Sequence, residues 1–242
     1  MHRFYADSAA ENGFVSLAAE DRSHALRVLR LQPGDEIEVF LSGRRWRAEL
    51  TVCREEEVTA RLLEALPDTE PGLQVTLYQG LPKGEKMELI VQKAVELGAC
   101  RIIPVGTARS VVKLDDKRAE KKTARWQTIA ESAASQSHRG ALPQVMPVMS
   151  FKEALELAKK ECGVRLIPYE LQEPGKTRGI LDQIRPGDSV AVFIGPEGGF
   201  EPGEVEAAKE AGFVPISLGR RILRTETAGL AFLSFMIYCL EL

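Results

Sequence analysis

The spacing of apolar residues changes partway along this chain of 242 residues. In the first part, short segments alternate polar and apolar residues with a period of two, as strands with one buried face do. They cover residues 13–17, 36–40 and 47–52. A short helix is expected from about Glu20 to Leu29, followed by a turn at residues 32–35. The pattern predicts a small β-barrel or sandwich.

The second part combines continuous apolar runs with helical spacing. The runs predict buried strands at residues 75–78, 101–105, 145–148, 164–167, 189–194 and 214–218. Apolar residues at helical spacing predict helices over 87–95, ending near Gly98, over 126–134 and over 204–211. Strands that alternate with helices in this way predict an α/β domain whose mainly parallel sheet is covered by helices on both faces.

A break in composition separates the two parts. Residues 67–72 hold two prolines and a glycine and offer no apolar side chain to a core. We therefore expect an amino-terminal domain over residues 1–70 and a carboxy-terminal domain over residues 73–242.

Composition narrows the class of protein. Hydrophobic residues make up 44% of the chain and charged residues 28%, which is ordinary for a globular protein. The four cysteines are far apart, without a CxxC pair or a histidine at ligand spacing, so no metal site is expected. The longest apolar run, residues 228–240, is too short to span a bilayer, and the first residues lack the apolar segment of a signal peptide. We expect a cytoplasmic protein that does not contact membranes.

Charge is distributed unevenly along the sequence. The chain has a net charge of −3, but residues 1–72 carry 9 basic and 14 acidic side chains, whereas residues 83–139 carry 12 basic and 7 acidic ones. A basic segment inside an acidic protein is typical of a surface that binds polyanions such as nucleic acid. It is equally compatible with ordinary solvated helix faces.

Candidate chemistry lies where predicted strands end, because ligands of open α/β sheets bind at the carboxyl ends of the strands. Residues 195–199 read GPEGG directly after an apolar run. Glycines here allow the backbone to approach a ligand closely, although a tight strand-to-helix turn would need them too. The segment matches neither the Rossmann nor the P-loop fingerprint.

A second unusual loop precedes the last helix. Arg220, Arg221 and Arg224 lie just before a helix expected over residues 228–238, with Thr225 or Thr227 available to cap it. Three arginines just before a helix amino terminus could bind a phosphate group or stabilise negative charge that develops in a reaction. The same pattern would also arise from a capped helix with solvated arginines. The helix is apolar on all sides, so it must be buried in the core or against a partner subunit.

These loops resemble the signature loops of the RsmE-type RNA methyltransferases of the SPOUT superfamily. They are GPEGG at 195–199 and LGRRILRTETA at 218–228, of which the second is the most specific. Other matching segments, in order along the chain, are HALRVLR at 24–30, GEKME at 84–88, QKAVELG at 92–98, RSVVKL at 109–114 and QSHR at 136–139. Ser135 stands where the family often has glutamate.

The resemblance implies a fold and a reaction. It implies an amino-terminal PUA-like β-barrel that binds RNA and a carboxy-terminal SPOUT α/β domain tied in a deep trefoil knot. It also implies S-adenosylmethionine bound in the knot, a homodimer that uses the last helix, and methyl transfer to N3 of one uridine in bacterial 16S ribosomal RNA. The substrate would then be the RNA, within the small ribosomal subunit.

Site residues carry over by motif. Arg224 is the first candidate for stabilising negative charge on the reacting base, with Arg220 and Arg221 in reserve, and the sequence does not identify a general base. Cofactor contacts are expected from Leu166, Ile167, Pro168, Gly195, Pro196, Glu197, Gly198, Gly199, Leu218, Gly219, Ile222, Leu223 and Thr225. RNA contacts are expected from Arg3, Arg27, Arg30, Arg109, Lys113, Lys121, Lys122 and Arg139.

Two other functions stay open. The chain could methylate another RNA atom, such as a ribose 2′-hydroxyl, as other knotted methyltransferases do. It could also be an RNA-binding ribosome-assembly factor without catalysis, although the intact glycine loop and the segment 224–227 argue against this.

Overall fold

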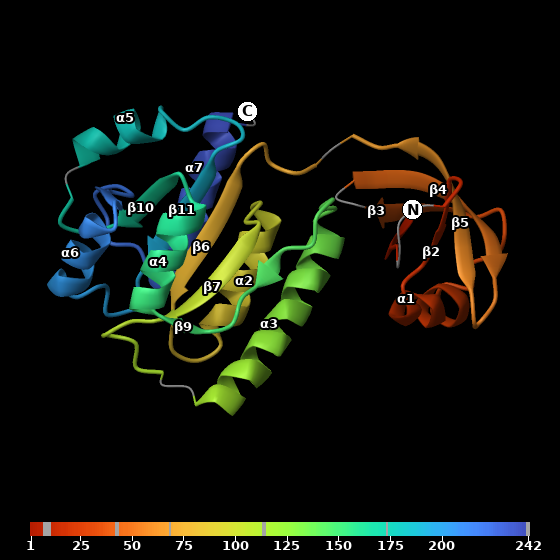
Figure 1. Ribbon diagram of the computed structural model, residues 1–242, viewed down its shortest axis with the longest axis horizontal. Helices are drawn as coiled ribbons and strands as arrows, with labels where there is room; N and C mark the ends of the chain where they lie inside the picture. Colours follow the sequence, from red (N-terminus) through yellow and green to blue (C-terminus); the bar gives the residue numbers. More distant parts are fainter. Residues whose placement is uncertain (7–10, 42–43, 68, 113–114, 173, 241–242) are drawn as a thin grey trace. The chain divides into compact units, whose positions relative to one another are not determined.

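The computed structural model describes residues 1–6, 11–41, 44–67, 69–112, 115–172 and 174–240. The chain divides into two compact units (Figure 1). One comprises Met1–Glu70 together with His138–Ala141, and the other comprises Pro71–Ser137 and Leu142–Leu242. Among the described residues, no helix is long and apolar enough to cross a membrane.

The amino-terminal unit is built on a five-stranded sheet in the order β1-β3-β4-β5-β2. Its strands are β1 (His2–Tyr5), β2 (Phe14–Ser16), β3 (Glu36–Leu41), β4 (Arg44–Cys53) and β5 (Val58–Ala65). Only β1 and β3 are parallel. The three predicted strands are confirmed, whereas β1 and β5 were not predicted. An additional bridge joins Ala6 to Leu17, just beyond the two edge strands.

A short helical segment covers the core of this unit. The predicted helix begins as α1 (Ala19–Ser23) and continues as one π turn, η1 (His24–Val28). Its Ala25 is fully buried with Phe4, Leu17 and Ile37. The core is therefore small and made mainly by the alternating inward residues of the strands.

A segment from far along the chain completes the amino-terminal unit. The Glu70 carboxylate accepts hydrogen bonds from the backbone N–H groups of Gly140 (2.7 Å) and Ala141 (3.0 Å), and it also binds the Arg139 guanidinium. The His138 carbonyl accepts hydrogen bonds from Thr69 and Arg45. Arg139 is only 4% exposed, so Glu70 and Arg139 form a buried ion pair that fixes residues 138–141.

The carboxy-terminal unit has a seven-stranded sheet. Six strands follow the order β12-β10-β11-β6-β7-β8, and β9 also pairs with β7. Every pairing among its described strands is parallel, which agrees with the prediction of a mainly parallel sheet. The strands are β6 (Gln74–Gly80), β7 (Arg101–Gly106), β8 (Gln144–Val145), β9 (Met149–Ser150), β10 (Val164–Pro168), β11 (Ser189–Ile194) and β12 (Val214–Ile216).

One predicted strand is wrong in detail. The run at 145–148 is not a continuous strand but two short ones, β8 and β9, with Pro147 between them. Proline has no N–H group to donate to the ladder, so pairing with β7 stops and resumes beyond it.

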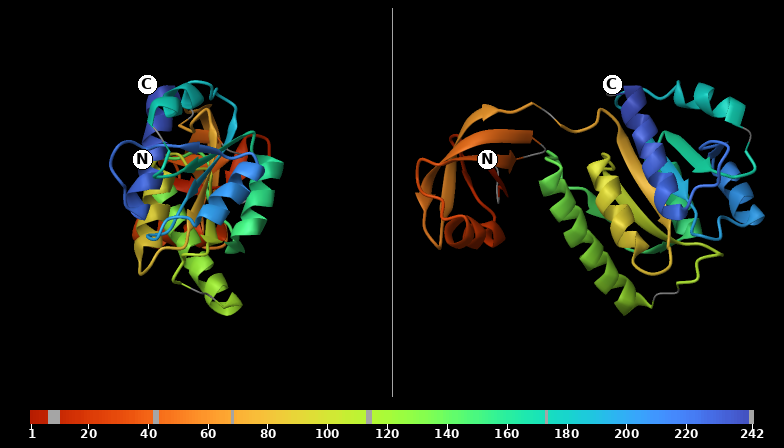
Figure 2. Two further views of the ribbon diagram at one scale, coloured as in Figure 1. Left: turned by 90° about the vertical axis from the view of Figure 1, so that its left-hand side faces the viewer. Right: turned by 180° about the vertical axis from the view of Figure 1, so that it is seen from behind.

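Helices cover both faces of this sheet, and the unit is therefore an α/β domain. They are α2 (Lys86–Glu96), α3 (Asp116–Gln136), α4 (Phe151–Glu161), α5 (Thr177–Leu181, preceded by the 3₁₀ turn Pro174–Lys176), α6 (Pro202–Glu210) and α7 (Thr225–Leu240). One core cluster joins α2, α3 and α7 to the sheet, and the other joins α4 and α6. The right-hand view of Figure 2 shows α2 in yellow and α7 in dark blue on their common face.

The central strand β11 shows why its sequence is apolar throughout. Val190, Val192 and Ile194 belong to the core cluster on one face, and Ala191 and Phe193 to the cluster on the other. A strand buried on both faces has no polar side to alternate with.

The sequence did not predict α4, although it carries a clear start signal. Ser150 and Glu153 form a capping box, in which each side chain binds the backbone N–H of the other residue. The last helix also begins earlier than predicted, at Thr225 instead of Ala228. This places Thr225 within the first turn of α7.

We predict that Glu70→Ala strongly destabilises the amino-terminal unit. The substitution leaves the buried Arg139 guanidinium without its carboxylate and two backbone donors without their acceptor, which costs about 3–5 kcal/mol for a buried pair. Hydrogen exchange in peptides from β4 measures the opening free energy of this unit.

Glu55→Ala is the matched control. It removes the Arg27–Glu55 pair, whose side chains are 68% and 73% exposed, and should cost less than about 1 kcal/mol. Equal effects of the two substitutions would show that the Glu70 cluster is not what holds this unit together.

Candidate active site

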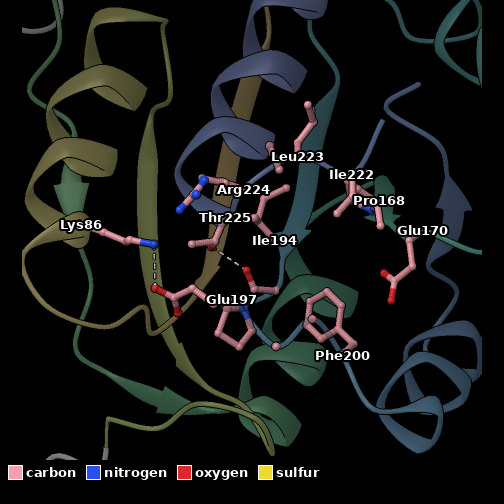
Figure 3. A pocket seen from close by; sticks show the side chains of 15 residues that line it. Lys86, Pro168, Glu170, Ile194, Glu197, Phe200, Ile222, Leu223, Arg224 and Thr225 are labelled. Carbon is pink, nitrogen blue, oxygen red and sulfur yellow. Dashed lines mark hydrogen bonds and ion pairs between the residues drawn. The ribbon is translucent and has the colours of Figure 1, made fainter. Parts of the chain in front are cut away.

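A cavity lies at the carboxyl ends of the parallel strands in the carboxy-terminal unit (Figure 3). Its volume is about 370 Å³, and a second cavity of about 130 Å³ adjoins it along Pro168, Glu170, Ile222, Leu223 and Ala228. The larger cavity is lined by Lys86, Pro168, Glu170, residues 194–200, residues 222–225 and Ala228. The smaller one adds Tyr169 and residues 217–221. The ends of the strands and the start of α7 therefore meet at this cavity.

Glycines allow the loop after β11 to pack tightly. A Cβ atom on Gly80, at the end of β6, would lie 2.7 Å from Pro196 Cδ, and one on Gly195 would lie 3.2 Å from the backbone of Gly199. Gly199 also has a φ of +67°, which side chains disfavour. Gly195 and Gly199, which were predicted to cradle a ligand, are thus required first by the packing of the loop's own backbone, and Gly80 is required by the approach of this loop to β6.

Thr225 links three segments through one buried hydroxyl. Its Oγ1 donates a hydrogen bond to the Gly195 carbonyl (2.6 Å) and accepts one from Gln79 Nε2 (2.9 Å). Gln79 is completely buried and Thr225 is 5% exposed. The end of β6, the end of β11 and the start of α7 are therefore held together from inside.

Three charged side chains from different segments meet beside this link. Lys86 Nζ lies 3.0 Å from Glu197 Oε1 and 3.2 Å from Glu226 Oε2, and Figure 3 shows the Lys86–Glu197 contact. Glu197 also accepts a hydrogen bond from the backbone N–H of Lys83. The cluster joins the start of α2, the loop after β11 and the first turn of α7.

The contacts of this cluster keep all three groups charged. The hydrogen bonds to Glu197 and Glu226 raise the pKa of Lys86. Burial disfavours the charged form of Glu197, but hydrogen bonds from Lys86 and the loop backbone outweigh it and hold its pKa below the ordinary value. Hydrogen bonding to its own backbone N–H, assisted by Lys86, lowers the pKa of Glu226.

The loop after β7 also reaches the glycine loop. Arg109 Nη1 donates a hydrogen bond to the Gly198 carbonyl (2.8 Å), and a Cβ atom on Gly198 would lie 3.1 Å from Arg109 Cβ. The backbone N–H of Ala108 donates to Glu204 of α6. Arg109, predicted from its motif to contact RNA, thus also stabilises the loop that lines the cavity.

Most of the predicted cofactor contacts lie around the two cavities. Pro168 and the whole segment 195–199 line the larger one, together with Ile222, Leu223 and Thr225, while Leu218 and Gly219 line the smaller one. Leu166 and Ile167 do not line either cavity. Their side chains are buried in the two core clusters, one on each face of the sheet.

The three candidate arginines are all exposed at this edge. Arg224 lines the larger cavity, and Arg220 and Arg221 line the smaller one. Ile222, between them, is 87% exposed, which is unusual for a large apolar side chain. The loop thus presents cations and an apolar residue to a ligand together.

The predicted RNA-binding residues lie in both units. In the amino-terminal unit, Arg3 pairs with Glu38 (2.7 Å), Arg27 pairs with the exposed Glu55, and Arg30 is exposed, whereas Arg139 is buried against Glu70. In the carboxy-terminal unit, Arg109 and Lys121 are exposed, and Lys122 Nζ lies 5.9 Å from the centre of the Trp126 ring. Lys113 lies outside the described residues.

The sequence did not single out Lys86, Gln79 or Glu170 as site residues. Lys86 lies in the GEKME segment, and Gln79 is a polar residue at the end of an apolar strand, so each carried a signal. Their meeting with Thr225 and Glu197 depends on strand order, which the sequence does not give. Over the described ranges, no group of three metal-ligating side chains is close enough to hold a metal ion.

Comparison with known proteins identifies the family of this chain. A family model described as an RNA methyltransferase domain matches residues 69–237, and one described as an RNA methyltransferase PUA domain matches residues 17–63. The ribosomal RNA small subunit methyltransferase E of Bacillus subtilis (strain 168) is 40% identical over 94% of this chain and 91% of its own. That of Mycobacterium bovis is 32% identical over 93% of this chain and 87% of its own.

A solved structure agrees with these relatives. The crystal structure of a ribosomal RNA small subunit methyltransferase E from Neisseria gonorrhoeae, bound to S-adenosyl methionine, matches with a TM-score of 0.80 and 37% identity, covering 98% of this chain and 97% of that one. The chain therefore belongs to the RNA methyltransferase family of the ribosomal RNA small subunit methyltransferases E, the RsmE-type family that its loops resemble.

Proposed function

We propose that this protein transfers a methyl group from S-adenosylmethionine to N3 of a specific uridine in bacterial 16S ribosomal RNA. The observation that carries this is the cavity in which the glycine loop, the Arg224 side chain and the start of α7 meet. Membership of the family and the S-adenosyl methionine bound to the relative from Neisseria gonorrhoeae support it. We place the reaction in the cytoplasm, on RNA within the small ribosomal subunit.

The cavity suits a cofactor of this size and chemistry. Its volume of about 370 Å³ lies within the roughly 300–1,000 Å³ usual for small-molecule sites. Ile194, Phe200 and Leu223 offer apolar walls, while Glu170 and the loop backbone offer polar groups. When bound, S-adenosylmethionine supplies an electrophilic methyl group on its sulfonium sulfur.

The chain's own residues would make the uridine reactive. Its N3 lies on the pairing edge, so the base must be unpaired or extruded before it can react. As N3 loses its proton, negative charge spreads to the flanking carbonyl oxygens, and Arg224 at the cavity wall would stabilise it, with Arg220 and Arg221 in reserve. Glu197 is bound to Lys86 and its pKa is lowered, so we do not assign it the role of general base.

We also propose that both units bind the RNA. The amino-terminal unit would be a closed PUA-like barrel, since the bridge between Ala6 and Leu17 connects its two edge strands. RNA phosphates would contact Arg3, Arg27 and Arg30 there, and Arg109, Lys113, Lys121 and Lys122 elsewhere. In this proposal Arg139 acts by fixing its segment, because its guanidinium is buried against Glu70.

The knot is part of the same proposal. The chain leaves β12 at the outer edge of the sheet and returns to the centre, where Thr225 of α7 binds Gly195 and Gln79. This return past the loops after β10 and β11 favours a deep trefoil knot around the cavity. An experimental structure in which the last segment stays outside those loops would contradict it.

Nucleosides from RNA treated with the protein and S-adenosylmethionine test the function directly. We expect 3-methyluridine by mass spectrometry from small ribosomal subunits. A 2′-O-methylated nucleoside would instead support the alternative target atom. RNA binding without any methylated nucleoside would support a non-catalytic assembly factor.

We predict that the protein is a dimer that uses α7. Phe232, Leu233 and Met236 are buried in the core, but Phe235 and Tyr238 are 41% and 73% exposed on the same helix. Sedimentation equilibrium should give twice the chain mass of 26.7 kDa, and Tyr238→Glu should lower it. A mass of 26.7 kDa at micromolar concentration would exclude this interface.

We predict that Gly198→Val weakens S-adenosylmethionine binding at least tenfold, or about 1.4 kcal/mol. The added Cβ atom would lie 3.1 Å from Arg109 Cβ and displace the loop. Calorimetric titration measures the change, and Gly203→Val, where no atom lies within 4 Å of an added Cβ, is the matched control. Unchanged affinity in the Gly198 variant would remove this loop from the cofactor site.

We predict that Arg224→Ala lowers the single-turnover rate by roughly 10²–10³ with little change in RNA affinity, because the charge that it stabilises exists only in the transition state. Rapid-quench measurement at saturating RNA checks the rate. A normal rate would contradict the catalytic role of Arg224.

The variant Lys121→Ala/Lys122→Ala provides the opposite control. These side chains lie on α3, away from the cavity, and would only neutralise phosphates. The variant should bind RNA more weakly, with a salt slope about two units smaller at most, and keep its rate at saturating RNA.

A further inference from the structure

Lys86 is a charged residue at the wall of the cavity. The resemblance to the family assigned no role to it. Its ammonium group contacts Glu197 and Glu226 at 3.0 and 3.2 Å. An ammonium group has three N–H donors, and these two carboxylates use two of them. Lys86 also lines the cavity, so its remaining donor is available to a ligand there.

The charged groups around the cavity are arranged asymmetrically. Lys86, Glu170, Glu197 and Arg224 are the charged side chains that line it. Figure 3 shows Lys86 and Arg224 on one side and Glu170 on the opposite side. Glu226 faces Lys86 from α7 and also interacts electrostatically with Arg224. Two cations that both interact with Glu226 therefore line the same part of the cavity.

We propose that Lys86 is a second catalytic cation, which shares with Arg224 the negative charge that forms on the uracil ring. The two carbonyl oxygens that flank N3 are acceptors, and two cationic donors on one side of the cavity can bind one each. This inference rests on the proposed function and adds a residue and a role to it. Glu197 and Glu226 act as positioning residues that hold the ammonium group at the wall.

The chemical step balances without a further reactant. The N3–H bond breaks and its proton passes to water, leaving an electron pair on N3 and charge on the adjacent carbonyl oxygens. That pair forms the new N–CH₃ bond as the bond from the methyl carbon to sulfur breaks, and the sulfur keeps the bonding electrons. Glu197 and Glu226 offset the positive charge of Lys86 at a distance, so it is the direct hydrogen bonds from the two cationic groups to the carbonyl oxygens that stabilise the deprotonated ring and raise the fraction of reactive base at neutral pH.

The experiment is the single-turnover rate as a function of pH at saturating RNA and S-adenosylmethionine. We expect Lys86→Met to react at least tenfold more slowly at pH 7, with the apparent pKa of the rate raised by about one unit because N3 ionises less readily. Its affinity for S-adenosylmethionine should stay within threefold of wild type. Lys86→Arg, which keeps the charge, should retain most of the shift in N3 acidity.

A merely structural role for Lys86 predicts a different result. Lys86→Met leaves two carboxylates without their cation, and Lys86→Met/Glu226→Gln relieves part of that repulsion. If Lys86 acts on the substrate, the double variant recovers thermal stability but neither the rate nor the apparent pKa. Recovery of both, or an unshifted pH profile in Lys86→Met, would overturn the proposal.

Lys93→Met is the matched control. Lys93 lies on the same helix and pairs with Glu96 at 2.8 Å, away from the cavity lining, so this variant should match the wild type at every pH. Failure of the proposed function is seen separately, because it would appear as absence of 3-methyluridine with the wild-type protein itself.

Discussion

The site depends on one buried hydrogen-bonded hydroxyl. Thr225 Oγ1 donates to the Gly195 carbonyl and accepts from Gln79, so the last helix of the chain is tied to the ends of two central strands. A polar group in such a dry position stabilises only if it is satisfied. Because the Thr225 hydroxyl is satisfied, Arg224 before it and Glu226 after it are held at fixed positions beside the glycine loop.

Charged side chains and backbone conformation contribute separately to the geometry around the Thr225 hydroxyl. The glycines let the loop after β11 pack against β6, and the exposed arginines add positive charge at the edge of the sheet. Lys86 stays ionised because it contacts both carboxylates, and Glu197 and Glu226 stay ionised because each binds Lys86 and backbone N–H groups. The site is built from the start of α2, the loop after β11 and the first turn of α7. Contacts between these segments fix its geometry, so no single segment has to be rigid by itself.

The sequence predicted what is local and left open what depends on topology. Period-two and apolar runs located most strands, and the glycine and arginine loops located most of the cavity lining. Leu166 and Ile167 were placed at a strand end, but alternation along β10 turns both side chains into the core. Lys86 and Gln79 each carried a signal, but their meeting with Glu197 and Thr225 could not be recognised, since β6 and β11 become neighbours only in the folded sheet.

The segment His138–Ala141 has a consequence for the order in which the protein forms. Its contacts with Glu70 join residues 69 to 71 positions apart. During synthesis the amino-terminal unit therefore remains incomplete after residue 70 has left the ribosome, until β6, α2, β7 and α3 have also been made. Loop closure over such a distance slows folding compared with local contacts. The two units consequently fold as interleaved parts of one chain and not one after the other.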